Sequence, residues 1–204
     1  NIASSYKIII VDDGSPDKSG QVADDLAEEY PEILTIHHEE NKGYGEALKT
    51  GFKHSTNYDW ICFTDGDDQY DVNELYHIAK LFHHYDLIVT FRYTKIYGTL
   101  RIFMSYIYNL LIRKLFKSNF RDHSSGLKVV RSEVIKDINL ISASTFIGAE
   151  IIVKAMVRGY PIGEVGIKTY PRRFGKSHST SVSNIIASIL DMLKIYKEIF
   201  KQKK

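Results

Sequence analysis

Short apolar runs alternate with longer amphipathic segments over the first half of the chain. The apolar runs have the length of strands buried on both faces, and the segments between them have helical spacing. Strands are predicted at Ile8–Val11, Ile33–Ile36, Trp60–Thr64 and Leu87–Thr90. Helices are predicted at Asp17–Tyr30, Glu46–Lys53 and Asn73–His84. This alternation predicts an α/β fold with a mixed, mostly parallel sheet flanked by helices.

The pattern changes in the second half, where helices dominate. They are predicted at Thr99–Phe116, from Ser132, at Phe146–Arg158 and at Asn184–Phe200, with strands at Gly126–Val130 and Ile162–Tyr170. The last helix has an apolar stripe on one side and a basic tail, Lys201–Lys204, behind it. We therefore expect one α/β domain over residues 1–180 and an appended amphipathic helix with a basic tail over residues 181–204.

Composition narrows the classes of function. The formal net charge is +2 over 204 residues, so general affinity for nucleic acid is not expected. Cys62 is the single cysteine and falls in a predicted buried strand, which fits a reducing, cytoplasmic compartment. No signal peptide is visible, and the apolar run Ile102–Ile112 is too short to cross a bilayer. The 14 tyrosines leave a homo-oligomer interface open.

An acidic run directly after a predicted strand carries the strongest chemical signal. Asp65, Asp67 and Asp68 lie beside Gln69, behind the apolar residues Trp60–Phe63. Capping the next helix would need one acid, and Asp71 or Asn73 could supply that cap. Clustered carboxylates repel one another unless a cation lies among them. A divalent ion whose coordination shell is not filled by the protein can also bind phosphate oxygens. The run therefore predicts a metal and phosphate site.

A second acidic pair, Asp12 and Asp13, follows the first predicted strand. A simple turn explains the pair when it is taken alone, because Asp, Gly, Ser and Pro all favour turns. Ligands of parallel sheets bind beyond the carboxyl ends of the strands, however, and both acidic groups fall there. A receiver-type signalling domain also has such acids, but it is shorter, needs one acceptor aspartate and has no use for the basic C-terminal third. We therefore favour a binding site.

Glycines and basic residues complete a predicted diphosphate site. The segment Asn41–Gly45 opens a helix and could either cradle a phosphate or form a tight turn. Arg92 follows the fourth predicted strand, and Arg172 lies in a basic, glycine-containing loop. Arginines and a divalent ion together neutralise the negative charge of a leaving diphosphate. The histidines lack metal-ligand spacing with cysteine, and we interpret most of them as surface or satisfied residues.

Taken together, these motifs resemble family 2 glycosyltransferases of GT-A fold, and more narrowly the dolichyl- or polyprenyl-phosphate sugar synthases. The first acidic turn matches the family's V-D-D-G-S, the glycine segment its N-x-G-x-G-x-A, and the acidic run its D-x-D-x-Q. Later positions resemble its D-x-x-S-G-F-K segment, the acid of a later helix and its R-x-x-G-x-S loop. These later positions are Asp122, Ser125, Gly126, Lys128, Glu150, Arg172, Gly175 and Ser177. The resemblance runs from about Lys7 to Ser177.

The resemblance implies roles for individual residues. Mg²⁺ or Mn²⁺ would bind at Asp65, Asp67 and Gln69, and Asp65 would also contact the nucleoside. The implied catalytic residues are Asp67, Arg92, Asp122 and Glu150. The implied substrate-binding residues are Asp12, Asp13, Lys42, Gly43, Asp65, Arg101, Ser125, Lys128, Arg172 and Ser177.

The chain also departs from the family pattern. Leu127 replaces an aromatic residue, His178 stands where lysine is common, and Tyr70-Asp71 replaces a proline-bearing turn. The family's first strand, nucleotide loop and first helix have no counterpart, so we expect an N-terminally incomplete catalytic domain. The Q-x-x-R-W motif of processive polysaccharide synthases is also absent, which argues against polymerisation.

The implied reaction is the inverting transfer of one sugar from a nucleotide-diphosphate sugar. A polyprenyl phosphate is the favoured acceptor, because the helices predicted at Thr99–Phe116 and Asn184–Phe200 could lie on the cytoplasmic face of a membrane. Packing of both helices on the sheet is the alternative. A glycan hydroxyl is the rival acceptor, and Asp122 or Glu150 would then serve as the base. A non-catalytic sugar-nucleotide sensor is disfavoured because the metal residues are intact.

Overall fold

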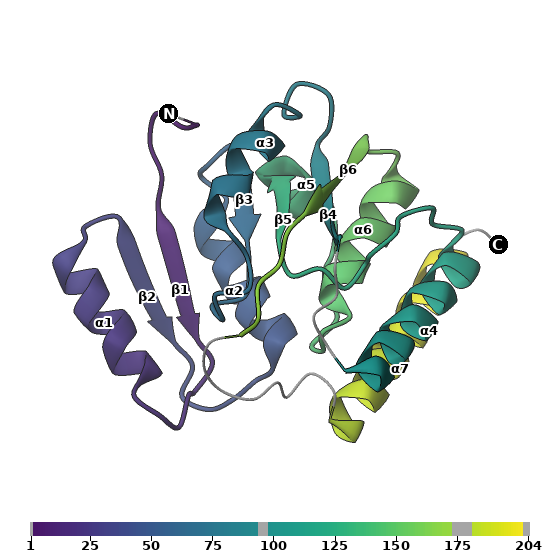
Figure 1. The fold of residues 1–204 in the computed structure, drawn as a ribbon, viewed down its shortest axis with the longest axis horizontal. Coiled ribbons are helices and arrows are strands. Elements are labelled where there is room, and N and C mark those ends of the chain that lie inside the picture. The colour runs from purple at the N-terminus through teal and green to yellow at the C-terminus, as the bar shows by residue number, and fades with distance from the viewer. Residues whose placement is uncertain (1, 94–97, 173–180, 202–204) are drawn as a thin grey trace.

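The computed structural model describes residues 2–93, 98–172 and 181–201, and it shows an α/β fold (Figure 1). The strands form two sheets. The smaller sheet pairs two parallel strands, β1 (Ile8–Asp12) and β2 (Ile33–His37). The larger sheet has the order β3 (Trp60–Phe63), β5 (Lys128–Arg131), β4 (Leu87–Arg92) and β6 (Ile162–Ile167). Because β5 runs antiparallel to β3 and β4 while β4 and β6 are parallel, the larger sheet is mixed, as predicted.

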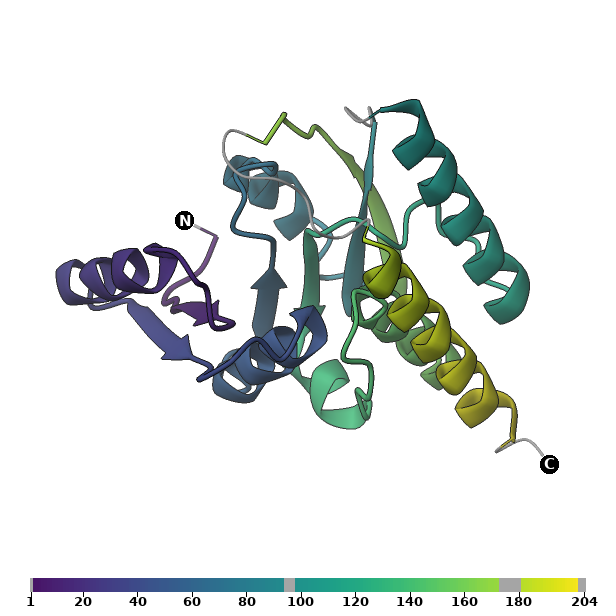
Figure 2. The ribbon, with the colours of Figure 1, turned by 90° about the horizontal axis from the view of Figure 1, so that it is seen from below.

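Helices connect and cover the strands. They are α1 (Ser19–Glu29), α2 (Tyr44–Ser55), α3 (Leu75–Ala79), α4 (Thr99–Phe116), α5 (Ser132–Asp137), α6 (Ile147–Arg158) and α7 (Val182–Lys201), with a 3-10 turn at Val72–Glu74. Helix α1 packs on the smaller sheet, and α2 contacts both β1 and β3. Helices α4 and α7 lie side by side at the opposite end of the molecule from α1 (Figures 1 and 2).

Three apolar clusters hold these layers together. One face of the larger sheet packs against α2, α5 and α6 through residues such as Phe52, Val130 and Ile151. The other face packs against Ile78 of α3. A third cluster joins α4, α6 and α7 around Phe146. Helix α6 is therefore buried between the sheet and the α4–α7 pair, which explains why its residues Ile147–Ala155 are all buried.

Several predicted element boundaries differ from the structure. The helix predicted to reach His84 consists of a 3-10 turn and the short α3, and turns follow it. The strand predicted to reach Tyr170 ends at Ile167. The predicted burial of Cys62 is wrong. Its side chain is exposed, because Ile61 and Phe63 on either side of it face the core and the strand alternates.

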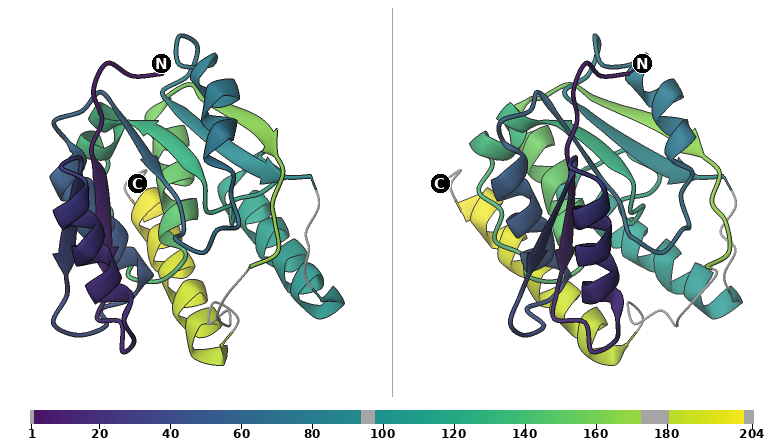
Figure 3. Two further views of the ribbon diagram at one scale, coloured as in Figure 1. Left: turned by 60° about the vertical axis from the view of Figure 1, so that its left-hand side comes forward. Right: turned by 90° about the vertical axis from the view of Figure 1, so that its left-hand side faces the viewer.

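A cleft separates the two sheets. Residues of β1 and residues of β3 line it together. Among the described residues, β1 pairs with β2 and β3 pairs with β5 (Figure 3). The facing edges of β1 and β3 therefore carry no strand between them in the described part of the chain. The α/β fold is as predicted, but its strands form two sheets instead of one.

Candidate active site

One long cleft collects most of the predicted site residues at the carboxyl ends of β1, β3 and β4. Its volume of about 2810 Å³ exceeds the roughly 300–1,000 Å³ of a single ligand pocket, because it is continuous with the space between the sheets. The predicted residues that line it are Asp12, Asp13, Lys42, Gly43, Asp65, Asp67, Gln69, Arg92, Arg101, Ser125, Lys128 and Arg172. The topology thus brings both acidic groups and the arginines to one place.

Two histidines at the end of β2 hold the first acidic pair. His37 contacts Asp12 Oδ2 through Nδ1 at 3.1 Å and Asp24 Oδ1 through Nε2 at 2.8 Å. The two carboxylates raise the pKa of His37, Asp24 more than Asp12. Hydrogen bonds from Ser15 and His37 lower the pKa of Asp12 against the opposing effect of its burial. His37 therefore ties α1 to the end of β1 through Asp24 and Asp12.

Asp13 has its carboxylate directed at the glycine-bearing segment. Its Oδ1 lies 2.6 Å from Nδ1 of His38 and accepts a 2.9 Å bond from the Lys42 amide. Its Oδ2 accepts a 2.8 Å bond from the Gly43 amide. Gly43 precedes α2 with φ of +97°, a conformation that favours glycine. Asp13 thus holds the entrance to α2, and its predicted contact with substrate remains a prediction.

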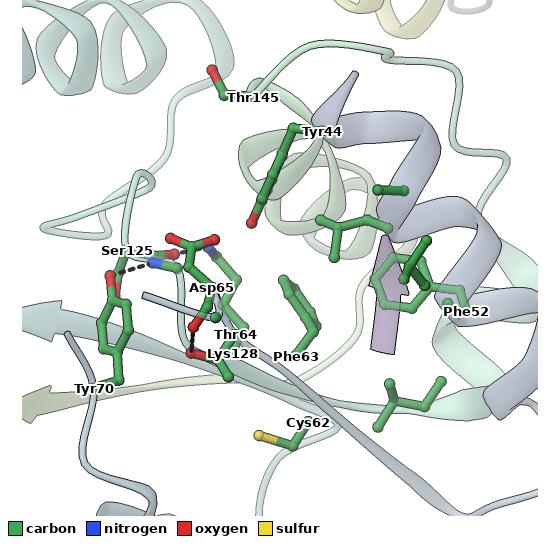
Figure 4. Close-up of a pocket in the computed structure, with 18 of the residues that line it drawn as sticks. Tyr44, Phe52, Cys62, Phe63, Thr64, Asp65, Tyr70, Ser125, Lys128 and Thr145 are labelled. Atoms are coloured by element: carbon green, nitrogen blue, oxygen red, sulfur yellow. Dashed lines mark hydrogen bonds between the residues drawn. The ribbon is translucent and has the colours of Figure 1, made fainter. Parts of the chain in front are cut away.

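The second acidic group forms a tight turn behind β3. Asp65 faces the hydroxyl of Tyr44, and Tyr44 lies in the first turn of α2 (Figure 4). Burial raises the pKa of Asp65 and the nearby charge of Asp67 raises it further, while Tyr44, Lys128 and Arg172 act in the opposite direction. Asp68 has φ of +59°, and it turns the chain so that Gln69 becomes buried. Asp65 and Asp67 carry like charges in one turn, which is why Asp67 opposes the ionisation of Asp65.

These side chains fit a divalent cation. Carboxylate oxygens are the ligands that Mg²⁺ prefers, and a cation between Asp65 and Asp67 would relieve their repulsion. The side-chain amide nitrogen of Gln69 donates to the Tyr170 carbonyl at 3.3 Å, which leaves the amide oxygen as its possible ligand atom. Within the described ranges no group of three or more His, Cys, Asp or Glu residues could hold a metal. An ion here would therefore complete its shell with phosphate oxygens and water.

Arg172 is paired with the acidic turn. Its Nη2 lies 2.5 Å from Asp67 Oδ2. The segment that carries Arg172 is joined to the turn by backbone contacts. The Tyr170 amide donates to the Gln69 carbonyl at 3.0 Å, and Tyr70 forms a β-bridge with Thr169. The chain after β6 is thereby fixed over the acidic turn.

Arg92, the last residue of β4, forms a buried ion pair. Its Nε donates to Asp122 Oδ2 at 2.8 Å, and its Nη2 donates to Ser124 Oγ at 2.8 Å. Asp122 Oδ1 also accepts bonds from the Ser124 amide and hydroxyl, at 3.0 and 2.7 Å. Arg92 and Asp122 therefore shape the turn at residues 122–125.

Lys128 supports the same turn from below. Its ammonium donates to the Ser125 carbonyl, and the side chain is fully enclosed beside the Phe63 ring (Figure 4). Burial lowers the pKa of Lys128 to about 8, although Asp122 and Asp65 oppose this shift. The Ser125 hydroxyl lies 2.5 Å from that of Thr90. Ser125 and Lys128 thus build the floor of the cleft.

Glu150 does not reach the cleft. It is fully buried in α6, accepts bonds from the amides of Ile141 and Ser142 at 2.9 Å each, and lies 2.9 Å from Lys154 Nζ. This geometry gives Glu150 a structural function, and its predicted role as a base stays a prediction that burial disfavours.

Some residues of the cleft were not predicted from the sequence. Tyr44 was part of the glycine motif but was not assigned a role, although it opens a helix at the functional edge. Tyr70 was noted only as a departure, yet its hydroxyl accepts a 2.7 Å bond from the Gly126 amide. Ser124 is a further partner of Arg92 that the spacing of the motif did not show. Ser177 and His178 lie outside the described residues.

Comparison with known proteins bears out the resemblance. The family model described as Glycosyl transferase family 2 matches residues 2–138. The chain belongs to glycosyltransferase family 2. The match covers both acidic turns, Arg92 and Lys128.

Curated relatives include enzymes that are named for lipid phosphates. The undecaprenyl-phosphate 4-deoxy-4-formamido-L-arabinose transferase of Enterobacter sp. (strain 638) is 30% identical over 86% of this chain and 53% of its own length. The glycosyltransferase AglD of Haloferax volcanii is 25% identical over 83% of this chain and 28% of its own length. This family 2 chain thus spans about half or less of those two relatives.

Solved structures share the fold of the family 2 chain. Glucosyl-3-phosphoglycerate synthase from Mycobacterium tuberculosis, in complex with Mn²⁺, UDP and phosphoglyceric acid, has a TM-score of 0.70 at 15% identity. The alignment covers 95% of this chain and 67% of the synthase. At this identity the likeness shows the fold, and it confirms the GT-A architecture.

Proposed function

We propose that this chain is the catalytic domain of an inverting, metal-dependent glycosyltransferase that moves one sugar from a nucleotide-diphosphate sugar to a polyprenyl phosphate. One observation carries the proposal: the acidic turn of Asp65 and Asp67 shares a cleft with Arg92 and Arg172. The acids can hold a divalent cation, and the arginines across from them can bind phosphates. Together they form a charge-matched diphosphate site.

The donor would lie across the ends of β1 and β3. Asp67 and Gln69, with Asp65, would hold Mg²⁺ or Mn²⁺, which neutralises charge on the departing diphosphate. Asp12 lies at the cleft end of β1, where the nucleoside would bind. Solved structures of the same fold are complexes with UDP and with Mn²⁺ or Mg²⁺, which supports this arrangement.

The exposed helix faces favour a lipid acceptor. Leu100, Phe103, Ile107 and Leu111 form an exposed apolar stripe on α4. Helix α7 has a similar stripe, formed by Val182, Ile186, Ile189, Leu190 and Leu193. Some of these residues, Ile107, Leu111, Ile189 and Leu190, also line the cleft, so apolar surface runs into the charged site. The two stripes would rest on the cytoplasmic face of a membrane.

None of the described helices has the length and apolar character needed to span a bilayer. In the proposal, α4 and α7 contact the membrane at its surface through their exposed apolar stripes. The relatives named as undecaprenyl-phosphate transferases support a polyprenyl phosphate as the acceptor.

The proposed chemistry is one displacement. An oxygen of the acceptor phosphate attacks the anomeric carbon as the bond from that carbon to the donor diphosphate breaks, so the configuration inverts and a nucleoside diphosphate leaves. An acceptor phosphate is already anionic and needs no strong base. Arg172 would stabilise the charge that grows on the leaving group, and Arg92 would orient the turn beside it.

The test uses the full-length protein with Mn²⁺, a panel of sugar nucleotides, and vesicles with or without polyprenyl phosphate. The proposal expects sugar transfer to the lipid that Asp67→Asn abolishes and EDTA suppresses. Asp68→Asn is the matched control, because Asn tolerates the positive φ at that position and the carboxylate is not assigned to the metal. Turnover that ignores the lipid but requires a glycan would establish the hydroxyl-acceptor rival. Equal transfer by Asp67→Asn and the wild-type protein would refute the proposed site.

A further inference from the structure

The pairing of Arg172 with Asp67 places a cation of the chain itself on the carboxylate that is predicted to bind the metal. The guanidinium Nη2 lies 2.5 Å from Asp67 Oδ2, and the side chains are 27% and 15% exposed, so water screens the pair only in part. Arg172 also acts on the neighbouring acid, because its charge lowers the pKa of Asp65. One arginine thus offsets the repulsion that a divalent ion would otherwise relieve.

The surrounding backbone holds this arrangement in register. The Tyr170 amide bonds to the Gln69 carbonyl, Gln69 Nε2 bonds to the Tyr170 carbonyl, and Thr169 bridges Tyr70. The other oxygen of Asp67, Oδ1, accepts a 3.2 Å bond from the Gln69 amide. Arg172 therefore meets Asp67 through the oxygen that is turned away from the turn's own backbone.

We propose that Arg172 is a resident counter-ion that exchanges partners: it neutralises Asp67 in the empty protein and yields that carboxylate to the metal as the donor diphosphate arrives. This inference rests on the proposed function for the identity of the donor. A divalent ion bound at Asp67 would lie next to the guanidinium, and the two positive charges would repel each other. The guanidinium can move from one anion to another at little electrostatic cost only when a new anion, the diphosphate, is present. Metal and diphosphate therefore enter together, and the metal alone binds weakly.

The inference makes opposite predictions for two ligands. Arg172→Gln removes the competing cation, so Mn²⁺ alone binds about two- to fivefold more tightly, the range expected for a partly screened ion pair. The same variant binds UDP in the presence of Mn²⁺ more weakly, because the arginine is missing from the diphosphate. If Arg172 had only a structural role, its replacement would weaken the binding of both ligands.

The experiment titrates Mn²⁺ into the full-length protein without nucleotide and follows free Mn²⁺ by electron paramagnetic resonance. Calorimetry with UDP and Mn²⁺ provides the second readout. Arg172→Lys keeps the positive charge and should bind Mn²⁺ alone as tightly as the wild-type protein does. In the double variant Arg172→Gln/Asp67→Asn, the gain in Mn²⁺ affinity should disappear. Arg121→Gln removes an arginine that is 70% exposed and should change neither affinity. Circular dichroism of each variant verifies folding.

Unchanged or weaker Mn²⁺ affinity in Arg172→Gln would overturn the exchange, and so would the absence of Mn²⁺ binding by every variant. The proposed function fails separately. If no sugar is transferred to polyprenyl phosphate but Arg172→Gln still gains Mn²⁺ affinity, the exchange stands and the proposed transfer does not.

Discussion

Arg92 Nε and Asp122 Oδ2 lie 2.8 Å apart, with side chains that are 6% and 3% exposed. Both charges are thus removed from water at the end of β4, beside the cleft. The desolvation cost of each charge is offset by the other, so the pair depends on both members being present.

Removal of either partner should therefore destabilise the protein strongly. We expect Asp122→Ala to lower the free energy of unfolding by about 3–5 kcal/mol, because it leaves Arg92 buried without its main counter-charge. Urea denaturation measures this change. Arg158→Ala is the control, because its pair with Asp137 is 58% and 39% exposed and should contribute less than about 1 kcal/mol. Equal effects of the two variants would contradict a buried pair.

His37 should give the protein a stability that depends on pH. Asp24 and Asp12 raise its pKa above the ordinary 6.5, so the folded state binds the proton more tightly than the unfolded state. The stabilisation is fully present below about pH 6.5 and is lost as the pH rises through the raised folded value. At the acid end it is lost again as Asp12 becomes protonated, at a pH below its ordinary 3.8.

Thermal melts of wild-type protein and His37→Gln test this relation. The difference in Tm should be larger near pH 6 than near pH 9. Asp24→Asn should reproduce most of the effect, because Asp24 makes the largest contribution to the shift in pKa. A difference in Tm that stays constant over this range would show that His37 acts by packing alone.

Lys128 should produce the opposite dependence on pH. Burial lowers its pKa from 10.5 to about 8. Between these two values the unfolded state binds more protons than the folded state, so the stability attributable to this residue rises with pH. Comparison of chemical denaturation of wild-type protein with Lys128→Met, near pH 7 and near pH 10, isolates that rise from other titrations. The free energy of unfolding of the wild-type protein should rise relative to that of Lys128→Met at the higher pH. If the difference between the two proteins does not change with pH, the ammonium is in water.

Two glycines of α2 offer a matched steric test. A Cβ on Gly45 would lie 2.5 Å from the Ser142 carbonyl oxygen, whereas one on Gly51 would meet Val11 Cγ2 at an ordinary 3.6 Å. Gly45→Ala should cost about 1–3 kcal/mol of unfolding free energy, because backbone must move. Gly51→Ala should be neutral or stabilising by up to about 1 kcal/mol, because alanine favours the helix. The reverse order in denaturation would contradict the close packing of α2 on residues 142–143.

Local patterns in the sequence predicted much of this fold, because each signal lies within one element. The apolar runs of β1, β3 and β4 were predicted from their length, and the gathering of the acids at the ends of β1 and β3 from the rule that strand ends meet at one edge. Contacts between distant segments left no such signal. The pairing of Arg172 with Asp67 spans 105 positions, and that of His38 with Asp13 spans 25. The family resemblance implied a catalytic role for Glu150. Its burial in α6 and its bonds to the amides of Ile141 and Ser142 became visible only in the structure.

Within the described residues the facing edges of β1 and β3 are open, which has a practical consequence for handling this part of the chain. Ile8 of β1 is 47% exposed, and the exposed Cys62 lies on β3. Strand edges with unpaired backbone groups are sites where other chains add strands. Self-association through these edges should therefore grow with concentration. Light scattering over a dilution series should come before any kinetic measurement.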